Sequence, residues 1–350
     1  GSYAGGLIGS ASGTVINSSV FGTVTGVASA YSGNYVGGLI GDSSATSSWN
    51  RYTGTLVKGS IYTGGLIGRN TGSLSNSYAA TATGVGDVQS SAYYVGGLVG
   101  YSSNAISGSS ATVGVGTTYA TGNVTASSDR VGGLVGWAAG GSINNVYATG
   151  NVSSPSIYVG GLVGSLDGAT VSDSSYITGT VSGASFVGGL VGVTNSTAVI
   201  KGSYTARPVT GLYDFVGGLV GKLAGTIQVS DAAVGSVPVN GTKYSYASGA
   251  VTGRYDVGGL VGRADTTASI NNTYSTGAVS ADLNYGGLVG FVTPGATLVN
   301  AHYNIDAVSI TGFTPASPST RVAVTGLITT GGLFGTQYTD WFTPALDGLA

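Results

Sequence analysis

The sequence predicts an all-β protein built as a parallel β-solenoid of about eleven coils of about 28 residues each, without substantial helix. Three observations predict this fold: a Gly-Gly-Leu motif recurs eleven times, strand-forming residues fill the segments between copies, and helix-forming residues are scarce. Of 350 residues 65 are glycine, all 13 acidic residues are aspartate, and methionine is absent. Because helices are usually rich in glutamate, methionine, leucine and lysine, this composition argues against any helical domain.

The Gly-Gly-Leu motif sets the length of the repeat. Ten copies read GGLVG or GGLIG, and the last reads GGLFG. Successive leucines are 27 to 45 residues apart, most often 28, which is a period typical of solenoids. A propeller is the rival fold, but its four-stranded blades need about 40 to 50 residues. The repeat leucines are Leu7, Leu39, Leu66, Leu98, Leu134, Leu162, Leu190, Leu219, Leu260, Leu288 and Leu333.

Each unit reads as short strands joined by tight turns. Segments such as INNVYATGNV at 143–152 combine Val, Ile and Tyr with Gly and Asn, a pattern typical of such strands. A unit of this kind satisfies its backbone groups by pairing each strand with the equivalent strand of the next unit. A tyrosine lies about 14 residues before most repeat leucines, at Tyr52, Tyr119, Tyr147, Tyr176, Tyr204, Tyr246 and Tyr274.

The spacing of apolar residues predicts bends within the unit. Val131 and Leu134 are three residues apart, and on a straight strand they could not both face the core because faces alternate. The Gly-Gly pair between them is therefore expected to be a corner or a bulge. The position before this valine, Arg130 in one unit and Asp256 in another, is expected to face water. We expect the unit tyrosines to face inward and stack from coil to coil, with an outward tyrosine ladder as the alternative.

Two units carry extra chain. Leu98 and Tyr119 are 21 residues apart, and Leu219 and Tyr246 are 27 apart, against 13 or 14 in ordinary units. The additions fall within 101–116 and 222–244, both after GGLVG, so both are expected at the same edge of the rod. They are interpreted as tolerated surface loops, with a polar contact surface in the second as the alternative.

The ends of the chain suggest a division into a solenoid, 1–305, and an irregular C-terminal coil with a cap, 306–350. Solenoids need caps because their terminal strands expose unpaired edges. Trp341 and Phe342 are assigned to such a cap, whereas the N-terminus enters the repeat at Leu7 with no visible cap. Excision from a longer protein is the favoured explanation, and end-to-end pairing of subunits is the alternative.

GGLVG followed by (I/V)-x-N-x-Y-A-x-G-x-V resembles the GLUG motif, a short repeat of bacterial secreted and surface proteins that include adhesins of the filamentous-haemagglutinin type. The resemblance covers roughly residues 3–335. It implies a β-solenoid and an extracellular or cell-surface location, and the motif has no catalytic residues to carry over. The family's usual cysteine before the tyrosine is replaced here by Val146, Ser175, Ser203, Ser245 and Thr273.

Composition also limits the chemistry. With no cysteine and one histidine, His302, the chain cannot build cysteine-based or multi-histidine metal sites, and we predict no catalytic residues, cofactor or metal. His302 has no titratable partner identifiable by spacing and is assigned to packing. A net charge of -2 gives no basic field for nucleic acid, and no apolar run is long enough to span a membrane.

Aspartates near the repeat leucines form one candidate site. Asp214, Asp256 and Asp282 precede Leu219, Leu260 and Leu288 by five, four and six residues. They could form a column with neighbours about 5 Å apart and with Arg254 beside them, as in a glycan or ion site. The simpler interpretation is a solvated row of turn aspartates.

Aromatic residues form a second candidate site for contact with glycans or surfaces. Tyr101, Trp137 and Phe291 all lie three residues after a repeat leucine, and Trp49 is a further candidate. The same position holds charged residues in other units, which indicates that this column faces outward. These charged residues are Asp42, Arg69, Lys222 and Arg263.

Together these patterns predict a non-enzymatic, extracellular structural or adhesive segment of a bacterial surface or secreted protein, such as a stalk, adhesin or biofilm-matrix component. A surface glycan or protein is the expected partner. One alternative is a self-assembling extracellular filament subunit joined head to tail through its end coils. A second alternative is a polysaccharide-active β-helix enzyme that uses the aspartates.

Overall fold

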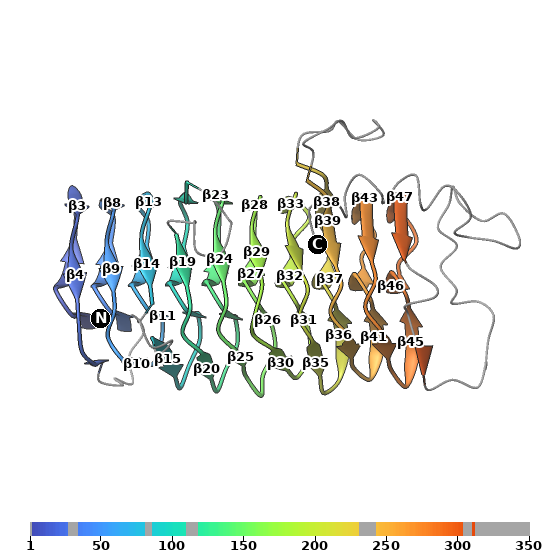
Figure 1. Cartoon of the computed structure of the whole chain (residues 1–350), viewed down its shortest axis with the longest axis horizontal. Helices are drawn as coiled ribbons and strands as arrows, with labels where there is room; N and C mark the ends of the chain where they lie inside the picture. The colour runs from blue at the N-terminus through green and yellow to red at the C-terminus, as the bar shows by residue number, and fades with distance from the viewer. Residues whose placement is uncertain are drawn as a thin grey trace, which may run out of the picture.

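The computed structural model describes residues 2–26, 34–80, 86–109, 118–230 and 243–303, and the backbone of 310–311. These residues form an all-β parallel solenoid whose coils are stacked along one long axis (Figure 1). The described residues contain no helix, and therefore none long and apolar enough to cross a membrane. Each coil passes in turn through four sheets, here called A to D.

Sheets A and B lie on either side of the Gly-Gly-Leu segment, and each has ten described strands. Sheet A consists of β1 (Ser2–Gly5), β6 (Asn34–Gly37), β11 (Thr63–Gly64), β16 (Val95–Gly96), β21 (Val131–Gly132), β26 (Val159–Gly160), β31 (Val187–Gly188), β36 (Asp214–Gly217), β41 (Tyr255–Gly258) and β45 (Leu283–Gly286). Sheet B consists of β2 (Ile8–Ala11), β7 (Ile40–Ser43), β12 (Ile67–Asn70), β17 (Val99–Ser102), β22 (Val135–Ala138), β27 (Val163–Leu166), β32 (Val191–Thr194), β37 (Val220–Leu223), β42 (Val261–Ala264) and β46 (Val289–Val292).

Sheet C usually takes two short strands from each coil, and sheet D takes one. Sheet C consists of β3 (Thr14–Ile16), β4 (Ser19–Val20), β8 (Thr46–Ser48), β9 (Arg51–Tyr52), β13 (Leu74–Ser75), β14 (Tyr78–Ala79), β18 (Ile106–Ser107), β19 (Tyr119–Ala120), β23 (Ser142–Asn144), β24 (Tyr147–Ala148), β28 (Thr170–Ser172), β29 (Ser175–Tyr176), β33 (Val199–Lys201), β34 (Tyr204–Thr205), β38 (Thr226–Gln228), β39 (Ser245–Ala247), β43 (Ser269–Ser275) and β47 (Thr297–Tyr303). Sheet D consists of β5 (Val24–Thr25), β10 (Leu56–Gly59), β15 (Asp87–Ser90), β20 (Val124–Ala126), β25 (Val152–Ser153), β30 (Val181–Gly183), β35 (Val209–Gly211), β40 (Val251–Thr252), β44 (Val279–Ser280) and β48 (Ile310–Thr311).

The predicted fold class is confirmed, with a smaller number of coils. The ten described strands of sheet B are connected by about nine turns of the chain, not the eleven coils that the motif count predicts. The eleventh motif, at Leu333, lies outside the described residues, as do Trp341 and Phe342. The division at residue 305 stays a prediction, although β48 beyond it still pairs with β44.

The repeat leucines hold successive coils in register through their backbone. The carbonyl oxygen of Leu162 accepts hydrogen bonds from the amides of both Leu134 and Val135 in the preceding coil, each at 2.9 Å. The same pair of bonds recurs at all nine repeat leucines from Leu39 to Leu288, with N···O distances of 2.8 to 3.1 Å. Both lone pairs of each of these leucine carbonyls are thus used.

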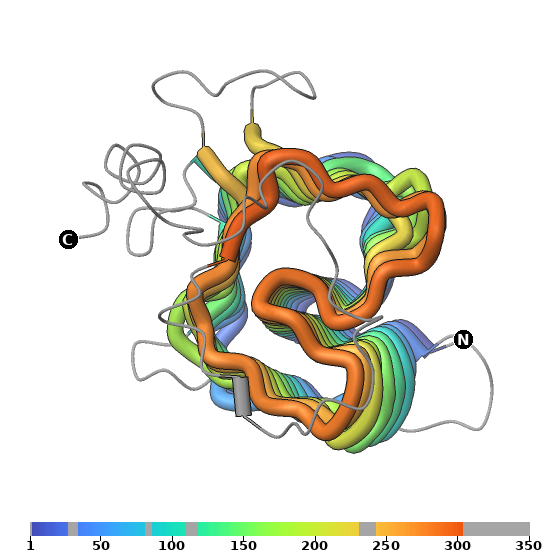
Figure 2. Tube along the Cα trace, turned by 90° about the vertical axis from the view of Figure 1, so that its right-hand side faces the viewer, coloured from blue at the N-terminus to red at the C-terminus, as the bar shows by residue number. Residues whose placement is uncertain are grey.

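The Gly-Gly-Leu segment is the predicted bend, and there each coil folds inward between sheets A and B (Figure 2). Val131 before the bend and Leu134 within it are both fully buried. A Cβ on Gly132 would lie 2.0 Å from the carbonyl oxygen of Val135, and one on Gly133 would lie 2.0 Å from that of Gly161. Only glycine fits at either position, because both contacts are with backbone atoms.

The third glycine of GGLVG lets sheet B approach sheet A of the preceding coil. A Cβ on Gly136 of β22 would lie 2.4 Å from the backbone nitrogen of Val95 in β16. A Cβ on the equivalent Gly41 of β7 would lie 2.8 Å from the backbone nitrogen of Ala4 in β1. Sheet B of one coil is therefore seated against sheet A of the coil before it, so that the inward folds interlock along the axis.

The unit tyrosines do not form one inward stack, which corrects that expectation. Only Tyr52 and Tyr176 of the seven share the inward register with core alanines such as Ala148, and both are fully buried. The other five lie one position earlier in the strands, on the face that the alternative predicted, although Tyr147 and Tyr274 are buried there. There the rings of Tyr119 and Tyr147 are stacked, with centroids 4.9 Å apart.

The two insertions leave the rod at the same place, as predicted. One leaves between β18 and β19, and the other between β38 and β39, so both interrupt sheet C between its two strands. The extra chain is shorter than the predicted ranges because β17 and β37 continue the regular coil. Residues 110–117 and 231–242, including Asp231 and Asn240 of the proposed polar surface, lie outside the described residues.

If close approach of sheets A and B holds the coils together, Gly136→Ala should be destabilising. The added Cβ would overlap the backbone of Val95, and overpacking of this kind costs about 1 to 3 kcal/mol. Gly86→Ala is a matched control, because the nearest atom to its added Cβ is 3.7 Å away. Thermal melting by circular dichroism should show a lower Tm for Gly136→Ala alone, and equal Tm values would contradict the interlock.

Burial of Tyr52 predicts a loss of stability at alkaline pH. The Tyr52 hydroxyl donates to the carbonyl oxygen of Gly22 at 2.6 Å or to that of Leu56 at 2.8 Å. Burial raises the pKa of Tyr52 to about 12 from 10.0. This contribution is therefore complete below pH 10 and is lost as the pH rises towards 12. The Tm of the wild type should fall more steeply across this range than that of Tyr52→Phe; parallel curves would refute the assignment.

Candidate functional site

Two columns of side chains run side by side along the outer surface, at the two ends of the inward fold. The leading column lies four residues before each repeat leucine and the trailing column three residues after it. The leading column consists of Tyr3, Tyr35, Tyr62, Tyr94, Arg130, Tyr158, Phe186, Phe215, Asp256 and Asn284. The trailing column consists of Ser10, Asp42, Arg69, Tyr101, Trp137, Ser165, Val193, Lys222, Arg263 and Phe291.

The interlock sets the two columns against each other with an offset of one coil. Trp137 stacks on Tyr94 of the preceding coil, with ring centroids 5.1 Å apart. Tyr101 meets Tyr62 of the preceding coil edge to face at 5.9 Å, and it also meets Trp137 at 5.0 Å. The middle of the double column is therefore a continuous aromatic surface, and its side chains are half-buried.

The leading column retains aromatic side chains in a backbone conformation that disfavours them. Its residues from Tyr62 to Asn284 all have φ between 46° and 62°. Each left-handed residue other than glycine costs about 1 to 2 kcal/mol, and bulky residues are rare there. Ring contacts offset part of this cost: Phe186 lies 4.9 Å from Tyr158 and 4.7 Å from Phe215, centroid to centroid. Strain of this kind is often kept at functional surfaces.

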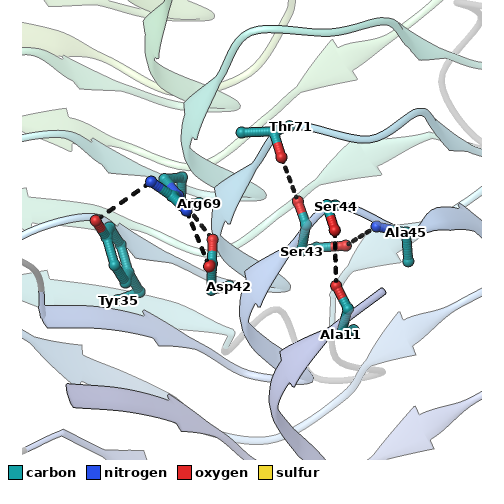
Figure 3. Close-up of polar contacts among 8 residues, drawn as sticks. All are labelled: Ala11, Tyr35, Asp42, Ser43, Ser44, Ala45, Arg69 and Thr71. Carbon is teal, nitrogen blue, oxygen red and sulfur yellow. Dashed lines mark hydrogen bonds and ion pairs between the residues drawn. The ribbon is translucent and has the colours of Figure 1, made fainter. Parts of the chain in front are cut away.

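The N-terminal end of the double column is charged. Arg69 pairs with Asp42 through both carboxylate oxygens, Nε to Oδ1 at 2.7 Å and Nη2 to Oδ2 at 3.0 Å (Figure 3). The Arg69 guanidinium also lies 4.6 Å from the centre of the Tyr35 ring and donates to the Tyr35 hydroxyl at 3.4 Å. Nearby, the Thr71 hydroxyl donates to the Ser43 carbonyl at 3.2 Å, and the Ser44 hydroxyl donates to the Ala11 carbonyl at 3.4 Å (Figure 3).

The C-terminal end of the double column is a second charged cluster. Lys222 pairs with Asp265 at 2.9 Å, and Arg263 lies 3.3 Å from Asp265 and 3.7 Å from Asp256. Burial raises the pKa of the Asp256 carboxyl, and a 2.9 Å hydrogen bond from Asn284 Nδ2 and the charge of Arg263 partly offset this. Both ends of the double column thus have their cations matched by carboxylates.

The predicted aspartate column does not form, which corrects that expectation. Asp214 is in register with Tyr255, whereas Asp256 is one position further along its strand. Asp282 lies beside Arg254, with which it makes an exposed ion pair at 3.5 Å. The three aspartates precede their leucines by different numbers of residues, so they belong to three different columns. In the described part of the chain, no group of three His, Cys, Asp or Glu side chains could hold a metal ion.

The outward trailing column was predicted, whereas of the leading column only its outward direction was predicted and its aromatic character was missed. The expectation that this position faces water is wrong for Asp256, which is buried. Tyr101, Trp137 and Phe291 are half-buried in one register, as expected. The signal for the leading column was available, because aromatic residues stand four before the repeat leucine in most of the described coils. Trp49 lies apart from both columns, at a corner of sheet C, and is 57% exposed.

The remaining predicted positions lie away from the double column. Leu7 belongs to the first described coil and is 55% exposed, whereas its equivalents from Leu39 to Leu260 are fully buried. His302 is in register with Tyr274 in sheet C, and burial lowers the pKa of its imidazole.

Comparison with known proteins supports the repeat assignment. The family model of the GLUG motif matches residues 127–153 and 253–280, and each match spans about one coil. Comparisons with curated proteins and with solved structures gave no match.

If the leading column serves a surface role, its residues should matter less to stability than core residues. Phe186→Asn removes two ring contacts but introduces a side chain that tolerates the φ of 55° at this position. We expect a loss of about 1 kcal/mol, against about 2 to 5 kcal/mol for Leu190→Ala in the core of the same coil. Melting temperatures of the two variants test this, and a larger drop for Phe186→Asn would make the column a structural element.

Proposed function

We propose that the chain is a non-enzymatic structural and adhesive segment that acts outside the cell, with the double column as its contact surface. The stacked coils provide a stiff support, since every coil is tied to the next through in-register pairing in all four sheets. The GLUG matches support the repeat architecture of a surface or secreted protein. The double column provides the surface that meets a glycan or a protein.

The observation that carries this proposal is the retention of aromatic rings at left-handed positions. Asn284 occupies the same column, so a residue that tolerates this backbone is compatible with the fold. Phe215 and Tyr158 nevertheless stand at equivalent positions, half-buried on the outside of the rod. Aromatic and arginine side chains of this kind are typical of interaction surfaces.

The alternative functions receive no comparable support. A polysaccharide-cleaving site was expected to use Asp214, Asp256 and Asp282 in one column, and the register separates them. Joining of subunits end to end stays a prediction from the sequence.

The proposal is tested by retention of the purified protein on immobilised polysaccharides and on bacterial and host cell surfaces. We expect binding to at least one of them, with the chain length of each soluble polymer unchanged after incubation. The double variant Tyr62→Ala/Tyr101→Ala should bind about tenfold less tightly, because both rings lie in the double column.

Tyr204→Ala/Tyr246→Ala is the matched control, since these stacked rings lie on sheet C, away from both columns. Its binding should equal that of the wild type. Failure of the wild type to bind any surface, or shortening of a polymer, would refute the proposed function.

A further inference from the structure

Arg130 differs from the other cations of the double column. Arg69, Lys222 and Arg263 each have a carboxylate oxygen within 4.0 Å. Arg130 makes none of the ion pairs found among the described residues. It stands in the middle of the aromatic stretch and is held at φ 58°.

The surroundings of Arg130 are aromatic rather than acidic. Its guanidinium carbon lies 5.4 Å from the ring centres of Tyr94 and Trp137 and 5.2 Å from that of Tyr158. Its Nε atom is buried and has no hydrogen-bond partner. Contacts with three rings favour the cation, but a ring face accepts no in-plane hydrogen bond from the guanidinium. A buried donor of a charged group that is left unpaired is costly.

Two aspartates near Arg130 in the sequence or through its ring contacts are engaged elsewhere: Asp129 adjoins it in the chain, and Asp167 binds Trp137. Asp129 accepts a hydrogen bond from the Ser156 hydroxyl. Asp167 accepts one from Trp137 Nε1 at 2.6 Å and one from the Ser165 hydroxyl at 3.3 Å. Neither carboxylate forms an ion pair with Arg130, since no oxygen of Asp129 or Asp167 lies within 4.0 Å of a guanidinium nitrogen.

We propose that Arg130 and its three rings form a binding site for a carboxylate of an acidic polysaccharide, a uronate chain that lies along the double column. Because Nε is buried, the carboxylate would bind the two terminal Nη groups, which can donate two parallel hydrogen bonds to it. The half-buried rings of Tyr94, Trp137 and Tyr158 supply apolar surface next to that charge for the sugar ring. The inference rests on the proposed adhesive function and names its ligand class.

The charge distribution favours a chain that carries at most one charge on each sugar over a more densely charged polyanion. With the offset of one coil, Ser165 in the trailing column lies beside Arg130, and Val193 lies beside Tyr158, the residue that follows Arg130 in the leading column; all three neighbours are neutral. A densely charged polyanion would require a row of cations, as in nucleic-acid or phosphate recognition. One unpaired cation among neutral neighbours fits one carboxylate of a sugar chain.

The test measures Kd for polygalacturonate and alginate oligosaccharides by isothermal titration calorimetry. Methyl-esterified polygalacturonate, dextran sulfate and neutral dextran are the comparison ligands. We expect the wild type to bind the uronates, and esterification to weaken binding about tenfold or more, because it removes the charge from the carboxylate. Arg130→Gln should weaken uronate binding by a similar factor, and Arg130→Lys should do so by less.

Arg254→Gln is the matched control, since Arg254 also lies over a ring, that of Tyr255 at 4.9 Å, but it is exposed and paired with Asp282. It should bind uronates like the wild type. Equal binding of the free and esterified polymers, or of wild type and Arg130→Gln, would overturn the Arg130 site while leaving adhesion intact. Preference for dextran sulfate would overturn the uronate assignment, and absence of binding to any polymer or cell surface would overturn both proposals. The ligand comparison does not depend on the folding of any variant.

Discussion

Close contact between backbones at the Gly-Gly-Leu bend is the constraint on which the rest of the structure depends. In each motif from Leu39 to Leu260, three glycines meet backbone atoms at distances that no Cβ could occupy, two within the bend and one against the preceding coil. The leucine carbonyl then accepts two hydrogen bonds, so the bend is both close-packed and tied to its neighbouring coil through the backbone. The inward fold, the register of all four sheets and the offset of the surface columns follow from this contact.

The same constraint explains why the surface columns are where they are. Sheets A and B approach each other inside the rod. The residues just before sheet A and those near the end of sheet B therefore lie side by side on the outer surface. In eight of the ten described coils a left-handed residue leads into sheet A, and this chain places Tyr94, Arg130 and Tyr158 there. Local backbone preference and surface chemistry conflict at these positions, and such conflicts are expected where a surface has a function.

Much of the coil could be predicted from the sequence because its signals are local. The three-residue spacing of Val131 and Leu134 predicted a bend at the glycines, and the position of Trp137 predicted an outward column. The stagger of one coil could not be predicted, because it is a contact between backbone atoms of residues such as Gly136 and Val95 in different coils. The prediction of the aspartate column was wrong for a related reason. Asp214 and Asp256 differ by one residue in their distance from the repeat leucine, which places them at different positions in the sheet. The pairing state of Arg130 depends on three-dimensional neighbours that its sequence position does not specify.

Native-state hydrogen exchange tests the role of the bend most directly. The amides of Leu134, Leu162 and Leu190, which donate to the leucine carbonyl of the next coil, should be among the slowest to exchange and should exchange at similar rates. Amides of sheet D in the same coils, such as Val152, should exchange faster, because that sheet lies away from the interlocked bend. If the leucine amides exchange as fast as those of sheet D, the interlocked bend does not hold the coils together.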